Sequence, residues 1–267
     1  MRVCERELSD VSESEPVVRR LSDTQAADLY LDLELPEGQE RPYTVTNTVQ
    51  TVDGKTALGG RAQGIGSAYD RLLLRRIRAA AEALMIGAGT LRAEEIEFRF
   101  PPELLASRRR RGLPRELVVV LITAGGSTLP LRRRLFALPT PDAVPVILTT
   151  ARAAESLRPT LPERVRVLVG GDEAVDLPRA FSLLRRDFGA RRLVVEGGPQ
   201  LNGALLAQGL VDEVFLTLAP KIIGGPSPGM VAGVTPPGGP RALELKAAFA
   251  YGSELFMRYR VLTPPQT

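Results

Sequence analysis

Short apolar runs alternate with helical or irregular stretches from residue 83 to residue 196. Each run is only four to seven residues long and is rich in Val, Leu and Ile, which is typical of buried strands. Stretches such as 174–188 between the runs have helical spacing. This alternation predicts an α/β fold with a central, mostly parallel sheet and helices on both of its faces. The predicted strands are 83–87, 117–123, 144–149, 165–169 and 193–196.

The two ends of the chain differ from this middle part. Residues 1–40 are charged and interrupted by Pro and Gly, so we expect an extension or strap in front of a single domain over 41–267. Strands at 213–219 and 254–262 flank a Gly/Pro-rich stretch. The last strand is expected to pair antiparallel at an edge, which makes the sheet mixed.

A further strand and helix are predicted near the start of the domain. The strand begins at Tyr43, has period-two alternation and ends at the turn Asp53-Gly54. A flexible glycine-rich loop, 59–66, follows, and Ser67 is placed to cap the next helix. The apolar positions of that helix are Leu73, Ile77, Ala80, Ala81 and Leu84.

The chain has no histidine and a single cysteine, Cys4. Catalysis by Ser–His or Cys–His pairs, imidazole or thiolate metal sites and disulfides are therefore excluded, and no metal is predicted. The chemistry must come from carboxylates, hydroxyls, Lys, Arg, backbone amides or a cofactor. No run approaches 18 apolar residues, and the first twenty residues are polar, so we expect no membrane contact and a cytoplasmic protein.

Arginine dominates the basic residues, with 32 arginines against three lysines, but the formal net charge is only +4. The arginine runs 108–111 and 132–134 have no interleaved aromatic residues, and the chain has no Trp to stack on bases. We interpret these runs as solvated loops and helix faces. Binding of nucleic acid is the alternative, and no nucleic-acid partner is predicted.

The strongest local signal is the segment LVVEGGPQLNG at 193–203. A buried strand ends at Glu196, and two glycines lead into a helix whose first turn suits Pro199. Free amides at a helix start attract phosphate, so the segment is a candidate site for a dinucleotide pyrophosphate. A tight turn with a glycine pair facing the core is an equal alternative, because the full GxGxxG pattern is absent.

Weaker signals lie elsewhere. Gly87-Ala88-Gly89-Thr90 follows a strand and suits either ligand contact or a plain turn. Gly54-Lys55-Thr56 resembles the end of a P-loop, but Val49 stands where the first glycine belongs, so an NTPase is rejected. Arg78 lies late in its helix, where a positive charge is favourable at the C-terminus. Binding of a phosphate by its guanidinium is the alternative. Glu94 and Glu95 are adjacent, and adjacent side chains of a helix point in different directions, so at most one of them could contact a given ligand.

Three blocks together resemble the reductase domain of riboflavin biosynthesis, which has a dihydrofolate-reductase-like fold. They are RPYTVTNTVQTVDGKTA, SAYDRLLLRRIRAAAEALMIGAGTLRAE and LVVEGGPQLNGALLAQGLVDEVFLTLAPKIIGG, and the likeness covers about 41–262. The resemblance implies reduction by NADPH of the ribosyl group of 5-amino-6-(5-phosphoribosylamino)uracil, or of its precursor pyrimidine, to ribityl. It also implies a homodimer. Without His or further Cys there is no zinc deaminase half, so we expect the stand-alone reductase.

The resemblance also assigns residues. It implies catalytic roles for Asn47, Asp53 and Glu196, and contacts to the substrate from Asn47, Arg78, Glu196 and Arg99. The implied cofactor-binding residues are Val49, Ser67, Thr90, Glu94, Gly197, Gly198, Pro199, Gln200, Leu201 and Asn202. Thr123 and Ser127 are expected at the 2′-phosphate of NADPH because they follow a central strand.

Three alternatives to this function stay open. Glu94 stands where the family has Asp, and the loop before Ser67 is shorter than in the family, so a reductase of a pterin or another imine fits the same fold. A non-catalytic protein that binds NADPH is the second alternative. Nucleic-acid binding through the arginine runs is the third.

Overall fold

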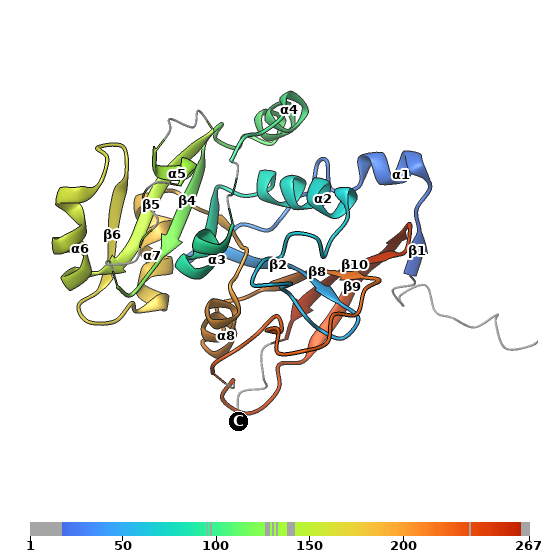
Figure 1. Cartoon of the computed structure of the whole chain (residues 1–267). Helices are drawn as coiled ribbons and strands as arrows, with labels where there is room; N and C mark the ends of the chain where they lie inside the picture. Colours follow the sequence, from blue (N-terminus) through green and yellow to red (C-terminus); the bar gives the residue numbers. More distant parts are fainter. Residues whose placement is uncertain are drawn as a thin grey trace, which may run out of the picture.

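A ten-stranded sheet runs through the molecule in the order β1-β9-β10-β8-β2-β7-β3-β4-β5-β6 (Figure 1). The structure is a computed structural model and describes residues 18–94, 96, 98–125, 129, 131, 133–137, 142–234 and 236–262. From β8 to β6 neighbouring strands are parallel, whereas β10 pairs antiparallel with both β8 and β9. The strands are β1 (Val18–Arg20), β2 (Tyr43–Thr51), β3 (Ala83–Gly87), β4 (Leu117–Ile122), β5 (Ala143–Thr150), β6 (Arg166–Gly171), β7 (Arg192–Val195), β8 (Glu213–Ala219), β9 (Leu243–Tyr251) and β10 (Glu254–Val261).

The mixed, mostly parallel sheet predicted from the apolar runs is confirmed, with one correction at its end. All predicted strands are present within a few residues. However, β10 is not at the edge, because β9 and β1 lie beyond it. The sequence of β9, LELKAAFAY, is rich in Ala and has few β-branched residues, so its strand was not predicted.

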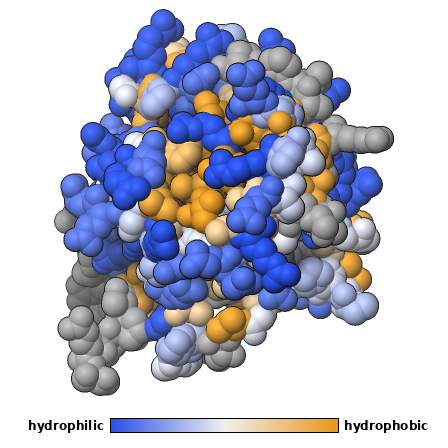
Figure 2. All heavy atoms as spheres, turned by 90° about the vertical axis from the view of Figure 1, so that its left-hand side faces the viewer, coloured by the Kyte–Doolittle hydropathy of each residue, from blue (hydrophilic) through white to orange (hydrophobic). Residues whose placement is uncertain are grey.

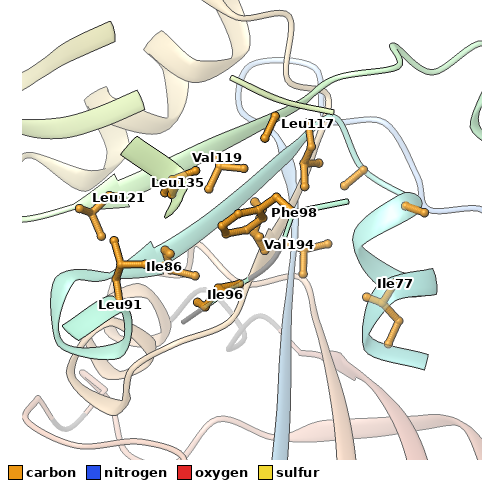
Figure 3. Packing of buried hydrophobic residues seen from close by; sticks show 14 of the residues in the cluster. Ile77, Ile86, Leu91, Ile96, Phe98, Leu117, Val119, Leu121, Leu135 and Val194 are labelled. Carbon is orange, nitrogen blue, oxygen red and sulfur yellow. The ribbon is translucent and has the colours of Figure 1, made fainter. Parts of the chain in front are cut away.

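Two apolar cores form, one on each face of the sheet. Helices α2 to α6 contribute to the first core, whose packing around Phe98 and Ile86 is shown in Figure 3. Helices α7 and α8 contribute to the second. The helices are α1 (Asp23–Asp28), α2 (Ala68–Ala79), α3 (Ala88–Ala93), α4 (Pro102–Arg110), α5 (Arg134–Ala137), α6 (Ala151–Leu157), α7 (Leu177–Asp187) and α8 (Pro199–Ala207), with a 3-10 turn at Arg158–Thr160.

Helix α2 begins as its sequence predicts and ends earlier. The Ser67 hydroxyl accepts hydrogen bonds from the amides of Tyr69 and Asp70, which is N-capping. The helix stops at Ala79, and Leu84, predicted to belong to it, lies in β3 instead. The change from a helical to an extended period within a continuous Ala-rich run is not marked by Gly or Pro, so periodicity alone misplaces it.

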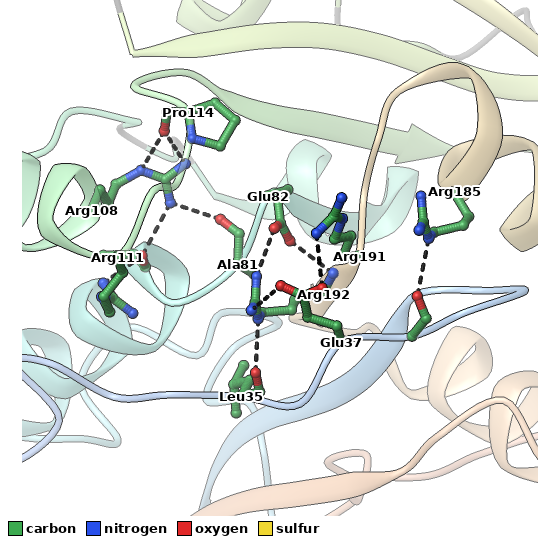
Figure 4. Close-up of polar contacts among 12 residues, drawn as sticks. Leu35, Glu37, Ala81, Glu82, Arg108, Arg111, Pro114, Arg185, Arg191 and Arg192 are labelled. Atoms are coloured by element: carbon green, nitrogen blue, oxygen red, sulfur yellow. Dashed lines mark hydrogen bonds and ion pairs between the residues drawn. The ribbon is translucent and has the colours of Figure 1, made fainter.

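Residues 18–40, which we call the strap, pack onto the domain. Strand β1 pairs with β9, and Leu33 and Leu35 are buried in the first core. Arginines from the domain donate to backbone carbonyls along the strap, and Figure 4 shows part of this arrangement. The donor–carbonyl pairs are Arg76 with Ala26, Ala27 and Leu29, Arg111 with Leu33, Arg192 with Leu35, and Arg185 with Gly38.

The arginine run 108–111 is solvated only in part: Arg109 and Arg110 are exposed as expected, whereas Arg108 is not. Arg108 is 0% exposed, and its guanidinium donates to carbonyls at and just after the end of α2 and in the loop after α4 (Figure 4). Those acceptors are Ala79, Ala81, Pro114 and Glu116. Burial lowers the pKa of Arg108 to about 10. This arginine therefore stabilises the fold and is hidden from any nucleic acid.

Figure 2 shows the face seen from the left-hand side of Figure 1, where hydrophilic side chains surround a central apolar area. The edge strand of this side of the sheet is β6. None of the helices in the described residues is long and apolar enough to cross a membrane.

Candidate active site

A cavity of about 690 Å³ opens at the carboxyl ends of three neighbouring strands. Its wall includes Gly87 at the end of β3, Thr123 after β4 and Glu196 after β7. These strands are adjacent and parallel, in the order β7-β3-β4. Ligands of open α/β sheets bind at this edge, because the loops and helix N-termini that follow the strands meet there.

The two predicted glycine segments lie side by side in this wall. The amide of Gly87 donates to the carbonyl of Gly197 at 2.7 Å, and a Cβ on Gly87 would lie 3.3 Å from the Gly198 nitrogen. Gly197 has φ +77°, a conformation that favours glycine, and the Gly197–Gly198 peptide bond is cis. Glycine at these positions therefore lets the two strand ends touch and leaves their backbone open to the cavity.

Helix α8 points its N-terminus into the cavity. Its N-cap is Gly198, which has no side chain to accept from the amides of the first turn, so within the described part of the chain these amides are available for an anion. Asn202, which is 3% exposed, donates from Nδ2 to the carbonyl of Met230 at 3.0 Å. Its Oδ1 is buried without a partner among the described residues. Free amides and an unused acceptor fit a dinucleotide with its pyrophosphate and hydroxyl groups.

Glu196 forms a bidentate ion pair with Arg78 on the cavity wall. The distances are 2.6 Å from Nε to Oε1 and 2.6 Å from Nη2 to Oε2, and the two side chains are 10% and 8% exposed. The Arg78 guanidinium also lies 5.6 Å from the centre of the Phe98 ring. A buried pair of this kind costs much to break, so Arg78 is held to Glu196 and fixes its orientation.

Asp70 is a cavity residue that the sequence analysis missed. It lies in the first turn of α2 and lines the cavity together with Asn47 and Glu196. Burial raises the pKa of Asp70 to about 6, and the negative charges of Glu254 and Glu196 act in the same direction. The only sequence signal was its position three residues after the capping Ser67, where an acid is ordinarily explained by the helix dipole.

A second hollow, of about 960 Å³, adjoins the cavity. We call it the arginine basin. It shares Asp70, Arg78 and Glu94 with the cavity, so the two form one continuous cleft. Within the described part of the chain, Arg75 and Arg99 have no side-chain hydrogen bond or ion pair. The arginines that line the basin are Arg61, Arg71, Arg75, Arg78, Arg99, Arg115 and Arg133.

The loop 59–66, predicted to be flexible, is tied to both sides of the cleft. Lys221 donates from Nζ to the carbonyls of Gly64 and Ile65 at 2.6 and 2.7 Å. On the other side, the amide of Ala62 donates to Glu94 Oε1 at 2.6 Å. Glu94 is extended and follows α3 rather than lying within a helix as predicted. Its carboxylate positions the loop that borders the cavity.

Most of the predicted site residues come together in the cleft, and Arg99 lies in the basin. Thr123 lines the cavity with its hydroxyl donating to the carbonyl of Gly125 at 2.6 Å. The predicted residues that line the cavity are Asn47, Val49, Arg78, Thr90, Glu94, Thr123, Glu196, Gly197, Gly198, Pro199, Gln200, Leu201 and Asn202.

Two predicted residues lie elsewhere. Asp53 accepts from the Thr51 hydroxyl and the Gly224 amide, contacts that hold its pKa at about 2, and it does not line the cavity. It joins the turn after β2 to the segment after β8, so we no longer assign it to catalysis. Ser67 donates its hydroxyl to buried Glu254 at 2.5 Å and caps α2, away from the cavity wall. Ser127 lies outside the described residues.

Comparison with solved structures identifies the class of fold. The structure is similar to a pyrimidine reductase-like protein of Corynebacterium diphtheriae, with a TM-score of 0.73 and 23% identity over 83% of this chain and 92% of that one. It is also similar to the riboflavin biosynthesis reductase Rib7 of Saccharomyces cerevisiae, with a TM-score of 0.61 and 14% identity over 85% and 93% of the two chains. The predicted dihydrofolate-reductase-like fold is confirmed.

Comparison of sequences identifies the family. The model of the RibD C-terminal domain matches residues 42–257, and the chain belongs to this family. It is 30% identical over 225 residues to the 2,5-diamino-6-ribosylamino-4(3H)-pyrimidinone 5′-phosphate reductase of Methanothermobacter thermautotrophicus, covering 83% of this chain and 99% of the relative. The riboflavin biosynthesis protein RibD of Chlamydia trachomatis is 30% identical over 187 residues, 68% of this chain and 47% of RibD.

These findings confirm the predicted kind of protein, a reductase of riboflavin biosynthesis. The likeness extends over nearly the whole length of the Methanothermobacter reductase and over about half of RibD. The roles of the individual residues stay predictions.

Proposed function

We propose that this protein reduces the ribosyl group of 2,5-diamino-6-ribosylamino-4(3H)-pyrimidinone 5′-phosphate to ribityl, with NADPH as the reductant. One observation carries the proposal: a continuous cleft joins the open N-terminus of α8 to the arginine basin. A dinucleotide and a phosphorylated substrate each require an anion-binding end, and the cleft offers both. Of the two substrates expected from the sequence, the aminouracil and its precursor pyrimidine, the names of three relatives favour the precursor, the diaminopyrimidinone.

The cofactor-binding end of the cleft consists of backbone amides and small side chains. We assign Gly198 to Asn202 to the cofactor phosphates, and Val49 and Thr90 to the nicotinamide half. When bound, a reduced nicotinamide supplies the hydride. Arg92, which lines the cavity near Gly89, joins Thr123 as the candidate contact for the 2′-phosphate that distinguishes NADPH from NADH.

The substrate end lies between the sheet and the arginine basin. Asn47 and Glu196 are assigned to the pyrimidine, because both line the cavity together with Asp70 and Arg78, which it shares with the basin. The ribose phosphate is assigned to Arg75 and Arg99. This changes the role first expected for Arg78: paired with Glu196, it orients that carboxylate rather than clamping a phosphate.

The decisive experiment mixes the purified protein with NADPH and the ribosylaminopyrimidinone phosphate. We expect the nicotinamide absorbance to fall and mass spectrometry to find a product with two additional hydrogen atoms. NADH in place of NADPH is the control for cofactor preference. Tight NADPH binding without turnover on either pyrimidine contradicts the proposal, and turnover on a dihydropterin instead supports the pterin alternative.

We also propose a homodimer in the cytoplasm. Two exposed apolar side chains support a dimer: Val52 is 60% exposed and Ile222 is 79% exposed. They lie close together, because the Val52 amide donates to the carbonyl of Lys221. Adjacent exposed apolar side chains favour association. Light scattering should give twice the chain mass for the wild type and a larger monomer fraction for the double variant Val52→Ser, Ile222→Ser; a monomeric wild type contradicts the dimer.

A further inference from the structure

The proposed reaction requires a proton donor that the residues assigned so far do not supply. In the closed ribosylamine, C1′ has single bonds to O4′ and to the exocyclic nitrogen, so it cannot accept a hydride. Opening the ring breaks the C1′–O4′ bond and leaves the electron pair on O4′, where an alkoxide is a poor leaving group unless it is protonated. The chain has no histidine, so the usual proton donor is absent.

Few side chains of the cavity could donate this proton. Among the described residues that line it, the carboxylic acids are Asp70, Glu94 and Glu196, and there is no lysine or tyrosine. Both oxygens of Glu196 accept from Arg78, and Glu94 accepts from the Ala62 amide. The ion pair occupies both oxygens of Glu196, and the contact with Ala62 commits the Glu94 carboxylate to the loop 59–66. Asp70 is the acid that remains.

Asp70 stands where the cavity meets the arginine basin, since it lines both. It also shares a small hollow with Asn47 and Thr217, next to the position assigned to the pyrimidine. Its carboxyl group lies directly against Gly66, where an added Cβ would be 2.0 Å from Oδ2. A sugar whose phosphate is in the basin and whose base is at Asn47 has its ring beside this carboxyl group.

The surroundings of Asp70 favour its protonated form. Burial is the main cause that raises its pKa, to about 6, and Glu254 on β10 and Glu196 after β7 add negative charge. The Thr217 hydroxyl on β8 and Arg71 on α2 act in the opposite direction. A general acid is most effective when its pKa is near the working pH. Bound phosphates would add negative charge and raise the pKa further.

We propose that Asp70 is the general acid that opens the ribose ring, an inference that rests on the proposed function. The Asp70 carboxyl group gives its proton to O4′ while the C1′–O4′ bond breaks. The lone pair of the exocyclic nitrogen forms the C1′=N bond, which leaves a cationic imine and an Asp70 carboxylate. The nicotinamide hydride then adds to C1′ and neutralises the imine, and a solvent proton restores the acid.

Asp70→Asn tests the role as general acid, because it keeps the shape of the side chain and removes the acidic proton. We expect kcat to fall by about 10²- to 10⁴-fold, with the dissociation constant of NADPH unchanged. Asp172→Asn, at an exposed acid outside the cavity, is the matched control and should keep wild-type kcat.

The pH profile separates a proton donor from a structural residue. A general acid must be protonated, so wild-type kcat/KM should fall as the pH rises through the pKa of Asp70, and the Asn variant should lack this limb. Thr217→Val removes a contact that lowers this pKa, so the limb should move to higher pH. Gly66→Ala, whose Cβ would displace the carboxyl group, should lower kcat while keeping NADPH binding.

The outcomes distinguish the two proposals. If the wild type reduces the pyrimidine and Asp70→Asn keeps kcat within about threefold with the same alkaline limb, the acid role is overturned and the proposed function stands. An alkaline limb unmoved by Thr217→Val also counts against Asp70 as its source. If the wild type does not reduce the pyrimidine at all, both proposals are overturned.

Discussion

Arginine side chains have opposite surroundings in two regions of this molecule. Around the strap, guanidinium groups donate to carbonyl and carboxylate oxygens of the protein, as for Arg192, which donates to the Leu35 carbonyl and pairs with Glu82 and Glu37 (Figure 4). In the arginine basin, Arg75 and Arg99 are exposed and, among the described residues, have no side-chain partner. The same residue type therefore stabilises the fold in one region and, in the other, is free to contact the phosphate that we propose there.

The difference has a physical cause. A guanidinium removed from water must satisfy its donors inside the protein, and the strap supplies a row of carbonyls that no strand or helix uses. An exposed guanidinium keeps its water and exchanges it for a phosphate at low cost. The number of arginines in a chain therefore indicates little about anion binding. The number of arginines without a hydrogen-bond or ion-pair partner within the protein is more informative.

The largest expected effect is at Arg108. Arg108→Met leaves the carbonyls of Ala79, Ala81, Pro114 and Glu116 without this donor, and a buried acceptor without a partner costs about 1–3 kcal/mol. We expect the free energy of unfolding in urea to fall by at least about 3 kcal/mol. Arg109→Ala, at the exposed neighbour, should change it by no more than about 0.5 kcal/mol. Equal losses from the two variants would contradict the distinction.

In the basin we expect a smaller effect, on substrate binding and not on stability. Arg75→Gln and Arg99→Gln should each raise KM for the phosphorylated substrate by about tenfold to a hundredfold, because a charge-assisted hydrogen bond contributes about 1.5–3 kcal/mol. The free energy of unfolding should stay within about 0.5 kcal/mol of wild type. Steady-state kinetics with the phosphorylated and dephosphorylated substrates measures this.

Arg152→Gln, at an exposed arginine on α6, is the control for a general change of charge. The phosphate assignment would be wrong if the basin variants weakened the dephosphorylated substrate as much as the phosphorylated one.

Much of the fold could be predicted from the sequence because it depends on local pattern. The apolar runs of the parallel strands, the cap at Ser67 and Pro199 in the first turn of α8 are all visible within a few residues. The strand β9 was missed because its Ala-rich sequence does not distinguish a strand from a helix. Its pairing with β10 and β1 depends on segments far apart in the chain.

The parts of the site that are formed by glycine backbone could be predicted from the sequence. The parts that are formed by charged side chains were harder to predict. Gly87 and Gly197 could be found because the close approach at Gly87 and the positive φ of Gly197 favour glycine. The ion pair of Arg78 and Glu196 joins residues 118 positions apart, and nothing in either local sequence announces it. Asp70 was missed for the same reason: its burial and its acidic neighbours come from other elements.

The sequence by itself determined the alternation that builds the sheet, the glycines that open its edge and the absence of histidine, which excludes imidazole as the acid. These are properties of residue type and spacing. Only the tertiary structure decided which arginines have partners within the protein, which carboxylate is paired and which lies in surroundings that favour its protonated form. Desolvation and charge–charge contacts depend on what packs around a group, and that packing is set by residues distant in the chain.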